Sequence, residues 1–409
     1  MISCIDEIDI VAESDFESLL VIEAVITNED KIHEITLSRV APLNTEENIP
    51  EMNASVRVID DVGNNYVFIE SSEGNYRSSN SFRALPDRNY ILEIQTTDGD
   101  LYQSSLTSLT SETPIGELYA ELGFNENASE GIIIKINSND ELGNTNYYRF
   151  EYEETYKIVA PLYNPKQVLI NNEPNFPLPI DYFSDLSFQE LIDYLVNLEF
   201  RPEQEQTCYN TVASNEIMIA STTELENDII EQYQIRFINR ENTIISHRYS
   251  ILVRQFILSQ EAYNYYRTLE SFSSEEDLFS QVQTGFLVGN ISNINNQEER
   301  VVGLFEVSAV DEKRIFFNYS DLYPNEPLPE YFVNCDYREI PGLLQISPLP
   351  PHNIIRSPLQ SALKTDLILY RELFDSNNGR RNPPFELVLE PCGDCTIYGE
   401  NVVPDFWQE

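Results

Sequence analysis

Apolar and polar residues alternate with a period of two along much of the first hundred residues, which is the pattern of half-buried β-strands. The runs are short and are separated by turn-forming residues, as where residues 60–65 follow the run that contains Val56 and Val58. Short strands joined by Gly, Asn and Asp turns are typical of a small β-sandwich. We therefore predict an N-terminal β-sandwich over residues 19–112, preceded by a tether over residues 1–18.

The same alternation resumes after Thr113-Pro-Ile115, which marks the join to a second β domain. The clearest run is residues 146–156, where aromatic residues alternate with charged ones in the order Tyr148, Arg149, Phe150, Glu151, Tyr152 and Glu153. Such a ladder could bind a sugar or a peptide, but one core face and one solvent face of a strand explain it more simply. Residues 248–317 have a strand–helix–strand order, and we predict that they form the core of this second domain.

Two segments have a helical pattern. In residues 187–199, Ser187 and Glu190 have the spacing of a capping box, and apolar residues recur on one helical face. In residues 261–280, Ala262, Tyr265, Tyr266 and Leu269 form an apolar stripe, which we expect to cover the sheet and not to meet a partner. We interpret both as insertions in a larger β-sandwich domain, residues 113–409, which ends in an irregular region that contains cysteines.

The fold class predicted from these patterns is mainly β. It comprises two successive immunoglobulin-like or fibronectin-like β-sandwich domains, with the helical insertions in the second. A hydrophobic content of 41% supports a folded chain with sizeable cores.

The charge balance is strongly acidic. The chain has 25 Lys and Arg against 69 Asp and Glu, a formal net charge of -44. Such a surface repels phosphate, so we expect no nucleic-acid partner and no direct adhesion to anionic lipid. No run approaches the roughly 18 apolar residues that a membrane-spanning helix needs.

The cysteines divide into Cys4 at the start and four in the second half of the chain, Cys208, Cys335, Cys392 and Cys395. An even set with one residue left over suggests paired cysteines in an oxidising compartment. Three pairings are open: 208–335 with 392–395, 208–392 with 335–395, and 208–395 with 335–392. The CxxC spacing of Cys392 and Cys395 could indicate redox chemistry, but after a β pattern we predict a structural disulfide.

Reactive centres are not evident. His33, His247 and His352 lie far apart and outside any metal-ligand motif, and GxSxG, P-loop and GxGxxG motifs are missing. The oxygen-rich set Asp60, Asp61, Asn64 and Asn65 could bind calcium, but turn chemistry explains it. We therefore predict no catalytic residue, no metal site and no cofactor.

The N-terminus suggests a lipid anchor. Ser3-Cys4 is similar to the end of a bacterial lipobox, in which the cysteine becomes the acylated N-terminus, and acidic residues follow directly. The basic and apolar regions of a signal peptide do not stand before it in this sequence, so either the sequence starts late or these regions have been removed. We predict lipidation of Cys4, because a diacylated cysteine provides a stable membrane anchor.

Taken in order, these segments resemble one known family. They are Ser3-Cys4, the strands at 20–27 and 35–39, Gly74-Asn-Tyr76, residues 147–156, residues 248–253, Glu261-Ala-Tyr263, Gly289-Asn-Ile291, Cys392-Gly-Asp-Cys395 and Pro404-Asp-Phe-Trp407. The resemblance is to the Bacteroidota surface lipoproteins of the domain of unknown function DUF4249, over nearly the whole chain. It implies an outer-membrane, lipid-anchored and surface-exposed protein, often encoded beside TonB-dependent receptors, and it supplies no catalytic residues.

Three functions follow as hypotheses. The first is a non-enzymatic surface lipoprotein that acts as accessory subunit of a TonB-dependent transporter or another outer-membrane assembly, with an outer-membrane β-barrel protein as partner. The second is a stand-alone glycan- or peptide-binding surface module. The third is a hydrolase, which would need a deep pocket with perturbed carboxylates.

Overall fold

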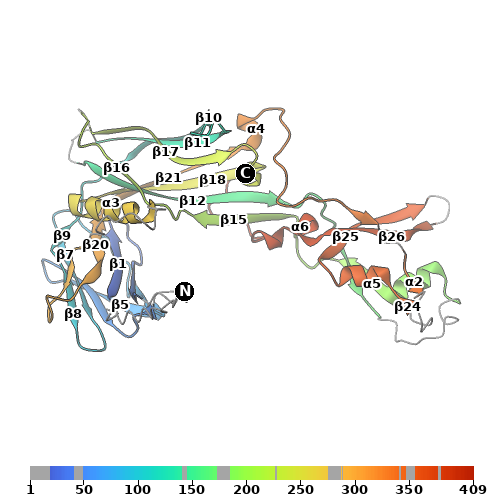
Figure 1. The fold of residues 1–409 in the computed structure, drawn as a ribbon, viewed down its shortest axis with the longest axis horizontal. Helices are drawn as coiled ribbons and strands as arrows, with labels where there is room; N and C mark the ends of the chain where they lie inside the picture. The colour runs from blue at the N-terminus through green and yellow to red at the C-terminus, as the bar shows by residue number, and fades with distance from the viewer. Residues whose placement is uncertain are drawn as a thin grey trace, which may run out of the picture.

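The computed structural model describes residues 19–40, 49–140, 145–172, 185–225, 228–274, 287, 289–339, 342–346, 355–375 and 379–409. The chain is mainly β, as predicted. Its strands form three main hydrophobic cores, and Figure 1 shows a first sheet, a second pair of sheets and an elongated arm. The immunoglobulin-like or fibronectin-like character of the sandwiches stays a prediction.

The first sheet contains eleven strands, which surround one core. Its main path runs β19-β8-β7-β4-β5-β6-β2-β1-β20, with β3 paired to β2 and β9 paired to β7. The strands are β1 Leu20–Thr27, β2 Glu34–Arg39, β3 Ile49–Pro50, β4 Ser55–Asp60, β5 Asn65–Ser72, β6 Asn75–Ser78, β7 Asn89–Gln95, β8 Leu101–Ser104, β9 Thr107–Ser108, β19 Ile291–Asn293 and β20 Val301–Ser308.

Strand β20 corrects one prediction. The segment that begins at Val301 was expected in the second core, but it pairs in parallel with β1 of the first sheet, from Leu20 opposite Val301 to Thr27 opposite Ser308. All residues of β20 except Val302 are buried, because one face joins the first core and the other is covered by the second region. A strand buried on both faces is a continuous apolar run, which does not reveal its partner.

The two ends of the first sheet are joined beside β19. The side chain of Asn290 donates to the carbonyl of Phe305 (2.9 Å) and accepts from its backbone N–H (2.8 Å). Gly289 allows this approach, since a Cβ there would lie 1.5 Å from the carbonyl oxygen of Gly303. Gly303 itself has a φ of 154°, in a region that L side chains rarely adopt.

The second region is a pair of sheets that share one core. One sheet has the order β10-β11-β17, and the other has β15-β12-β18-β21 with β16 paired to β12. The strands are β10 Ile115–Phe124, β11 Glu130–Asn139, β12 Tyr147–Val159, β15 Thr207–Ala213, β16 Met218–Ser221, β17 Ile229–Asn239, β18 Arg248–Ile257 and β21 Val310–Asn318, with the short helices η1 Thr243–Ile245 and α4 Tyr319–Leu322.

A third core belongs to the C-terminal arm, which extends away from the two sheet regions in Figure 1. The sequence pattern predicts helical insertions and an irregular end here, and the separate core is a difference from that prediction. The arm contains β13 Lys166–Ile170, α2 Phe188–Leu195, β14 Val196–Phe200, β22 Arg338–Glu339, β23 Gln345–Ile346, β24 Ile355–Arg356, α5 Pro358–Leu363, β25 Leu367–Asp375 and β26 Gly379–Leu389. At its base lie α6 Glu390–Gly393 and η2 Cys395–Ile397.

Both predicted helices are present. The capping box at α2 is confirmed, with Ser187 and Glu190 bonded reciprocally, but the helix ends at Leu195, and Val196–Phe200 instead pairs with β13 as a strand. The second helix, α3, spans Gln260–Ser274, and residues 275–280 of the prediction lie outside the described residues. Among the described residues, no helix is both long enough and apolar enough to cross a membrane.

Candidate functional site: a cleft between the sheets

A cleft of about 540 Å³ opens where the first sheet, the second region and helix α3 meet. Strands β1 and β20 form one wall, and β12, β16 and the loop before β16 form the other. Its lining residues are Val21, Ile22, Glu23, Ala24, Val25, Arg149, Phe150, Glu151, Ser214, Asn215, Glu216, Ile217, Met218, Tyr265, Tyr266, Leu269, Leu287, Val302 and Leu304.

The β1 wall follows from strand alternation. Leu20, Ile22, Ala24 and Ile26 point into the first core, so Val21, Glu23 and Val25 face outward toward the cleft. Of these three, only Glu23 is exposed, and the two valines are half-buried. The outer face of the first sheet is thus an apolar wall with a carboxylate at its surface.

Helix α3 packs over the junction between the two regions. Ala262, Tyr263, Tyr265 and Tyr266 share one apolar cluster with Leu304 of β20 and with Phe256 and Leu258 at the end of β18. Three residues of the expected stripe, Ala262, Tyr265 and Tyr266, therefore cover sheet residues, as expected, while Leu269 lines the cleft. The helix packs against both regions at once, so α3 connects them.

A buried ion pair lies behind the cleft. Arg149 of β12 is only 7% exposed, and its guanidinium lies 3.3 Å from a carboxylate oxygen of Glu306 in β20, which is 2% exposed. Arg149 also pairs with Glu151 and lies over the rings of Phe256 (4.1 Å) and Tyr266 (4.8 Å). A buried charge is tolerated only when it is paired, so these contacts hold Arg149 in place.

The hydroxyl of Tyr266 completes this pair by donating to Glu306 at 2.7 Å. Burial, followed by the charge of Glu306, raises the pKa of Tyr266 well above its usual value. The hydroxyl therefore stays protonated and acts as a hydrogen-bond donor. It is a structural group here, not a base.

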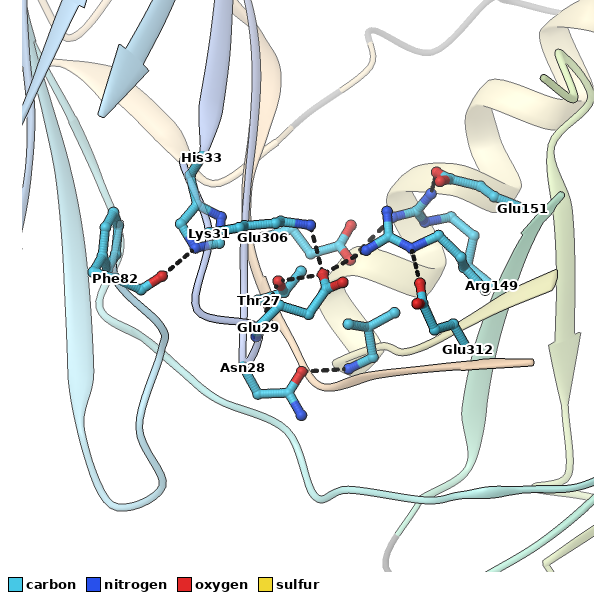
Figure 2. A network of polar contacts seen from close by, with 12 residues as sticks. Thr27, Asn28, Glu29, Lys31, His33, Phe82, Arg149, Glu151, Glu306 and Glu312 are labelled. Carbon is cyan, nitrogen blue, oxygen red and sulfur yellow. Dashed lines mark hydrogen bonds and ion pairs between the residues drawn. The ribbon is translucent and has the colours of Figure 1, made fainter. Parts of the chain in front are cut away.

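A second polar network joins the β1–β2 loop to the second region (Figure 2). Glu29 accepts hydrogen bonds from Thr27 (2.8 Å) and Lys31 (2.5 Å) and pairs with Arg254 of β18. Arg254 also lies 3.6 Å from Glu312 of β21. A smaller opening of about 320 Å³ borders this network, and Arg149 and Glu151 line both openings.

The predicted cysteine sites lie elsewhere. Cys4 is outside the described residues. The other four are paired as Cys208–Cys395 and Cys335–Cys392, which is one of the three open pairings. The prediction of structural disulfides is confirmed, but the CxxC segment closes no loop of its own, since each of its cysteines reaches a distant segment.

The remaining candidates have structural surroundings. His33 is buried, and its Nε2 donates to the carbonyl of Phe82 at 2.9 Å. Asp60 is a turn residue that accepts hydrogen bonds from the backbone of Asn64 (2.8 Å) and Val62 (3.2 Å). His352 lies outside the described residues. Within the described part of the chain, no group of three or more His, Cys, Asp or Glu side chains could hold a metal ion.

The alternating pattern of residues 146–156 predicts the strand but not the role of Arg149. Its aromatic face is buried, as predicted: Tyr148, Phe150 and Tyr152 belong to the second core. The opposite face was expected to be solvated, yet at Arg149 it is covered by α3 and β20. The available signal was Arg149 itself, the single basic residue within an otherwise aromatic and acidic run.

The arrangement is suited to binding. The charged groups at the back of the cleft are matched with one another, and the open part presents apolar walls with carboxylates near the surface. No curated protein matches the chain. A family model described as "Domain of unknown function (DUF4249)" matches residues 5–314, most of the chain, and the protein therefore belongs to this DUF4249 family.

Proposed function

We propose that the protein is a non-enzymatic outer-membrane surface lipoprotein, anchored through Cys4, that acts as accessory subunit of a TonB-dependent transporter or another outer-membrane assembly. The observation that carries this proposal is the arm. It has its own core and reaches away from the sheets, so it offers a broad surface to a large partner (Figure 1).

The arm exposes side chains of the kind found at protein interfaces. Phe200 is 71% exposed, Tyr337 is 53% exposed and Leu169 is 41% exposed. Arg371 lies over the rings of Tyr337 (5.7 Å) and Tyr370 (5.4 Å). Aromatic residues and arginine are enriched among the residues that contribute most to binding energy, which supports a partner on this surface.

The test is affinity capture from native outer membranes with the full-length protein as bait. We expect a β-barrel partner of the TonB-dependent receptor type to co-purify. The double variant Phe200→Ser/Tyr337→Ser should capture at least tenfold less of it. The matched control Val62→Ser/Ile69→Ser removes exposed apolar residues of the β4–β5 turn and of β5, and it should capture as much as the wild type.

Capture of no barrel protein by the wild type would refute the accessory role. Equal capture by both double variants would refute the role of the arm. Mass spectrometry of the mature N-terminus tests the anchor separately, because an unmodified Cys4 rules out lipidation.

The second candidate is a stand-alone glycan- or peptide-binding module. The cleft favours it, since it is concave and apolar-walled and has the tyrosines Tyr265 and Tyr266 at its helical side. In that case the isolated protein binds a small ligand without any membrane partner.

A further inference from the structure

The lining of the cleft has an excess of negative charge. Its acidic residues are Glu23, Glu151 and Glu216, and its basic residue is Arg149. Arg149 is already matched by the buried carboxylate of Glu306. Glu23 and Glu216 are exposed, so their charges remain available to a ligand. Because the walls between them are apolar and of low dielectric, these charges attract a cation more strongly than the same groups on a flat surface.

Tyr265 also favours a cationic ligand in the cleft. Burial, followed by the charge of Glu23, raises the pKa of its hydroxyl to about 12. The neutral phenol keeps its proton at physiological pH and presents an apolar ring beside a carboxylate. An aromatic face next to a carboxylate is a favourable surface for an ammonium or guanidinium group.

The remaining lining is apolar, and this restricts the ligand further. Val21, Val302, Leu269 and Leu287 line the cleft together with Met218. A small inorganic cation would leave these apolar surfaces exposed to water. The volume of about 540 Å³ accommodates a few side chains, so the matching ligand has a positive charge flanked by apolar groups.

Segments of this chain outside the described residues do not have the positive charge that the cleft requires of a ligand. Residues 1–18 contain Asp6, Glu7, Asp9, Glu13, Asp15 and Glu17 and no Lys or Arg. Residues 275–286, which follow α3 in the sequence, contain Glu275, Glu276 and Asp277 and again no Lys or Arg. Both segments have the charge of the cleft itself, so the occupant comes from another molecule.

We infer that the cleft between β1, β20, β12 and α3 binds a basic peptide segment of another protein, in which Lys or Arg alternates with apolar residues. The apolar side chains lie against Val21, Val302 and Leu269, and the cationic group lies between Glu23 and Glu216. This inference rests on the cleft as a binding site, the second candidate above, and needs neither the lipid anchor nor the barrel partner.

The test uses the purified protein and a fluorescein-labelled peptide with the sequence Gly-Leu-Lys-Val-Arg-Leu-Gly. A second peptide carries Glu in place of both Lys and Arg. We expect saturable binding of the basic peptide, measured by fluorescence anisotropy, and none of the acidic one. Raising the salt from 0.1 M to 1 M shortens the Debye length from about 10 Å to about 3 Å, so the affinity should fall at least fivefold.

Variants separate the cleft from the general acidity of the chain. Glu23→Gln/Glu216→Gln should weaken binding about tenfold, whereas Glu73→Gln, at an exposed glutamate in the turn between β5 and β6, should leave it unchanged. Leu269→Lys places a cation inside the cleft and should abolish binding. Val62→Lys makes the same change on an exposed residue elsewhere and should not.

Three results would overturn the inference: no binding of the basic peptide at millimolar concentration, equal binding of the acidic peptide, or equal losses in Glu73→Gln and the cleft double variant. Circular dichroism confirms that each variant is folded. Because this assay contains no membrane protein, its failure leaves the barrel-capture experiment unaffected, and the reverse also holds.

Discussion

The arm and the first sheet are joined to the second region in different ways. At the base of the arm, two disulfides link Cys208 to Cys395 and Cys335 to Cys392. At the first sheet the contacts are noncovalent: helix α3 packs across the junction, and the buried ion pair Arg149–Glu306 connects β12 to β20 beneath it. Disulfides reinforce one joint, and a buried ion pair reinforces the other.

The difference has a physical consequence for each joint. A disulfide stabilises mainly by restricting the unfolded chain, so its effect is large even where the native contacts are few. A buried ion pair contributes little net stability, but losing one partner is costly because the other charge is left buried. We therefore expect the arm to respond to reduction and the sheet junction to respond to charge changes and pH.

The largest effect is expected at the disulfides. Cys208 and Cys395 are 187 residues apart, and Cys335 and Cys392 are 57 apart. The loop-entropy relation gives losses in the free energy of unfolding of about 5 kcal/mol for Cys208→Ala/Cys395→Ala and about 4 kcal/mol for Cys335→Ala/Cys392→Ala. Chemical denaturation without reductant measures both. Midpoints that match the wild type would show that the arm does not need its covalent links.

A loss comparable to that of the disulfide with the shorter loop is expected when the junction loses Arg149. Arg149→Met leaves Glu306 buried and uncompensated and should cost about 3–5 kcal/mol of unfolding free energy. The double variant Arg149→Met/Glu306→Leu replaces the pair with apolar groups and should recover most of that loss. Chemical denaturation of the single and double variants provides the measurement.

The matched control for this experiment is Arg77→Met. Arg77 pairs with Glu34 at 3.3 Å, but both side chains are largely exposed, so its loss should cost less than about 1 kcal/mol. If Arg149→Met were as mild as Arg77→Met, the ion pair would not be a critical part of the junction. The contrast with the covalent joint would then disappear.

The two joints also differ in how far the sequence could predict them. Alternation located most strands of the sheets, because a one-sided core imposes a period of two on each strand. The even set of cysteines predicted disulfides, but their pairing depends on which segments the fold brings to the base of the arm. The pattern around Ser187 predicted α2, because a capping box is a local interaction.

The junction was less predictable because its parts are distant in sequence. β1, at Leu20–Thr27, pairs with β20, at Val301–Ser308. No local pattern specifies the register of two strands so far apart in sequence. Arg149 belongs to a strand face that is normally solvated, and it is buried only because α3 and β20 arrive from later segments. The core of the arm was missed for the same reason, since its short apolar runs do not identify their partners.

The smallest of these effects is expected from a change of pH, through His33 near the junction. His33 lies beside the network that anchors the β1–β2 loop (Figure 2). Burial is the main cause that lowers its pKa to about 4. Lys31 lowers it further, while the carbonyl of Phe82 and the charge of Glu29 act in the opposite direction. The folded protein therefore favours the neutral imidazole.

In the unfolded chain the same imidazole has a pKa of about 6.5. Below that pH the unfolded state binds a proton that the folded state does not, so stability is present above pH 6.5 and is lost as the pH falls to about 4. The shift corresponds to about 3 kcal/mol in total. His33→Gln keeps a donor for Phe82 but cannot titrate, so between pH 7 and pH 4 it should lose about 3 kcal/mol less unfolding free energy than the wild type. Equal losses of unfolding free energy in the two proteins would show that His33 does not cause the acid sensitivity of the fold. The two joints would then not differ in their response to pH.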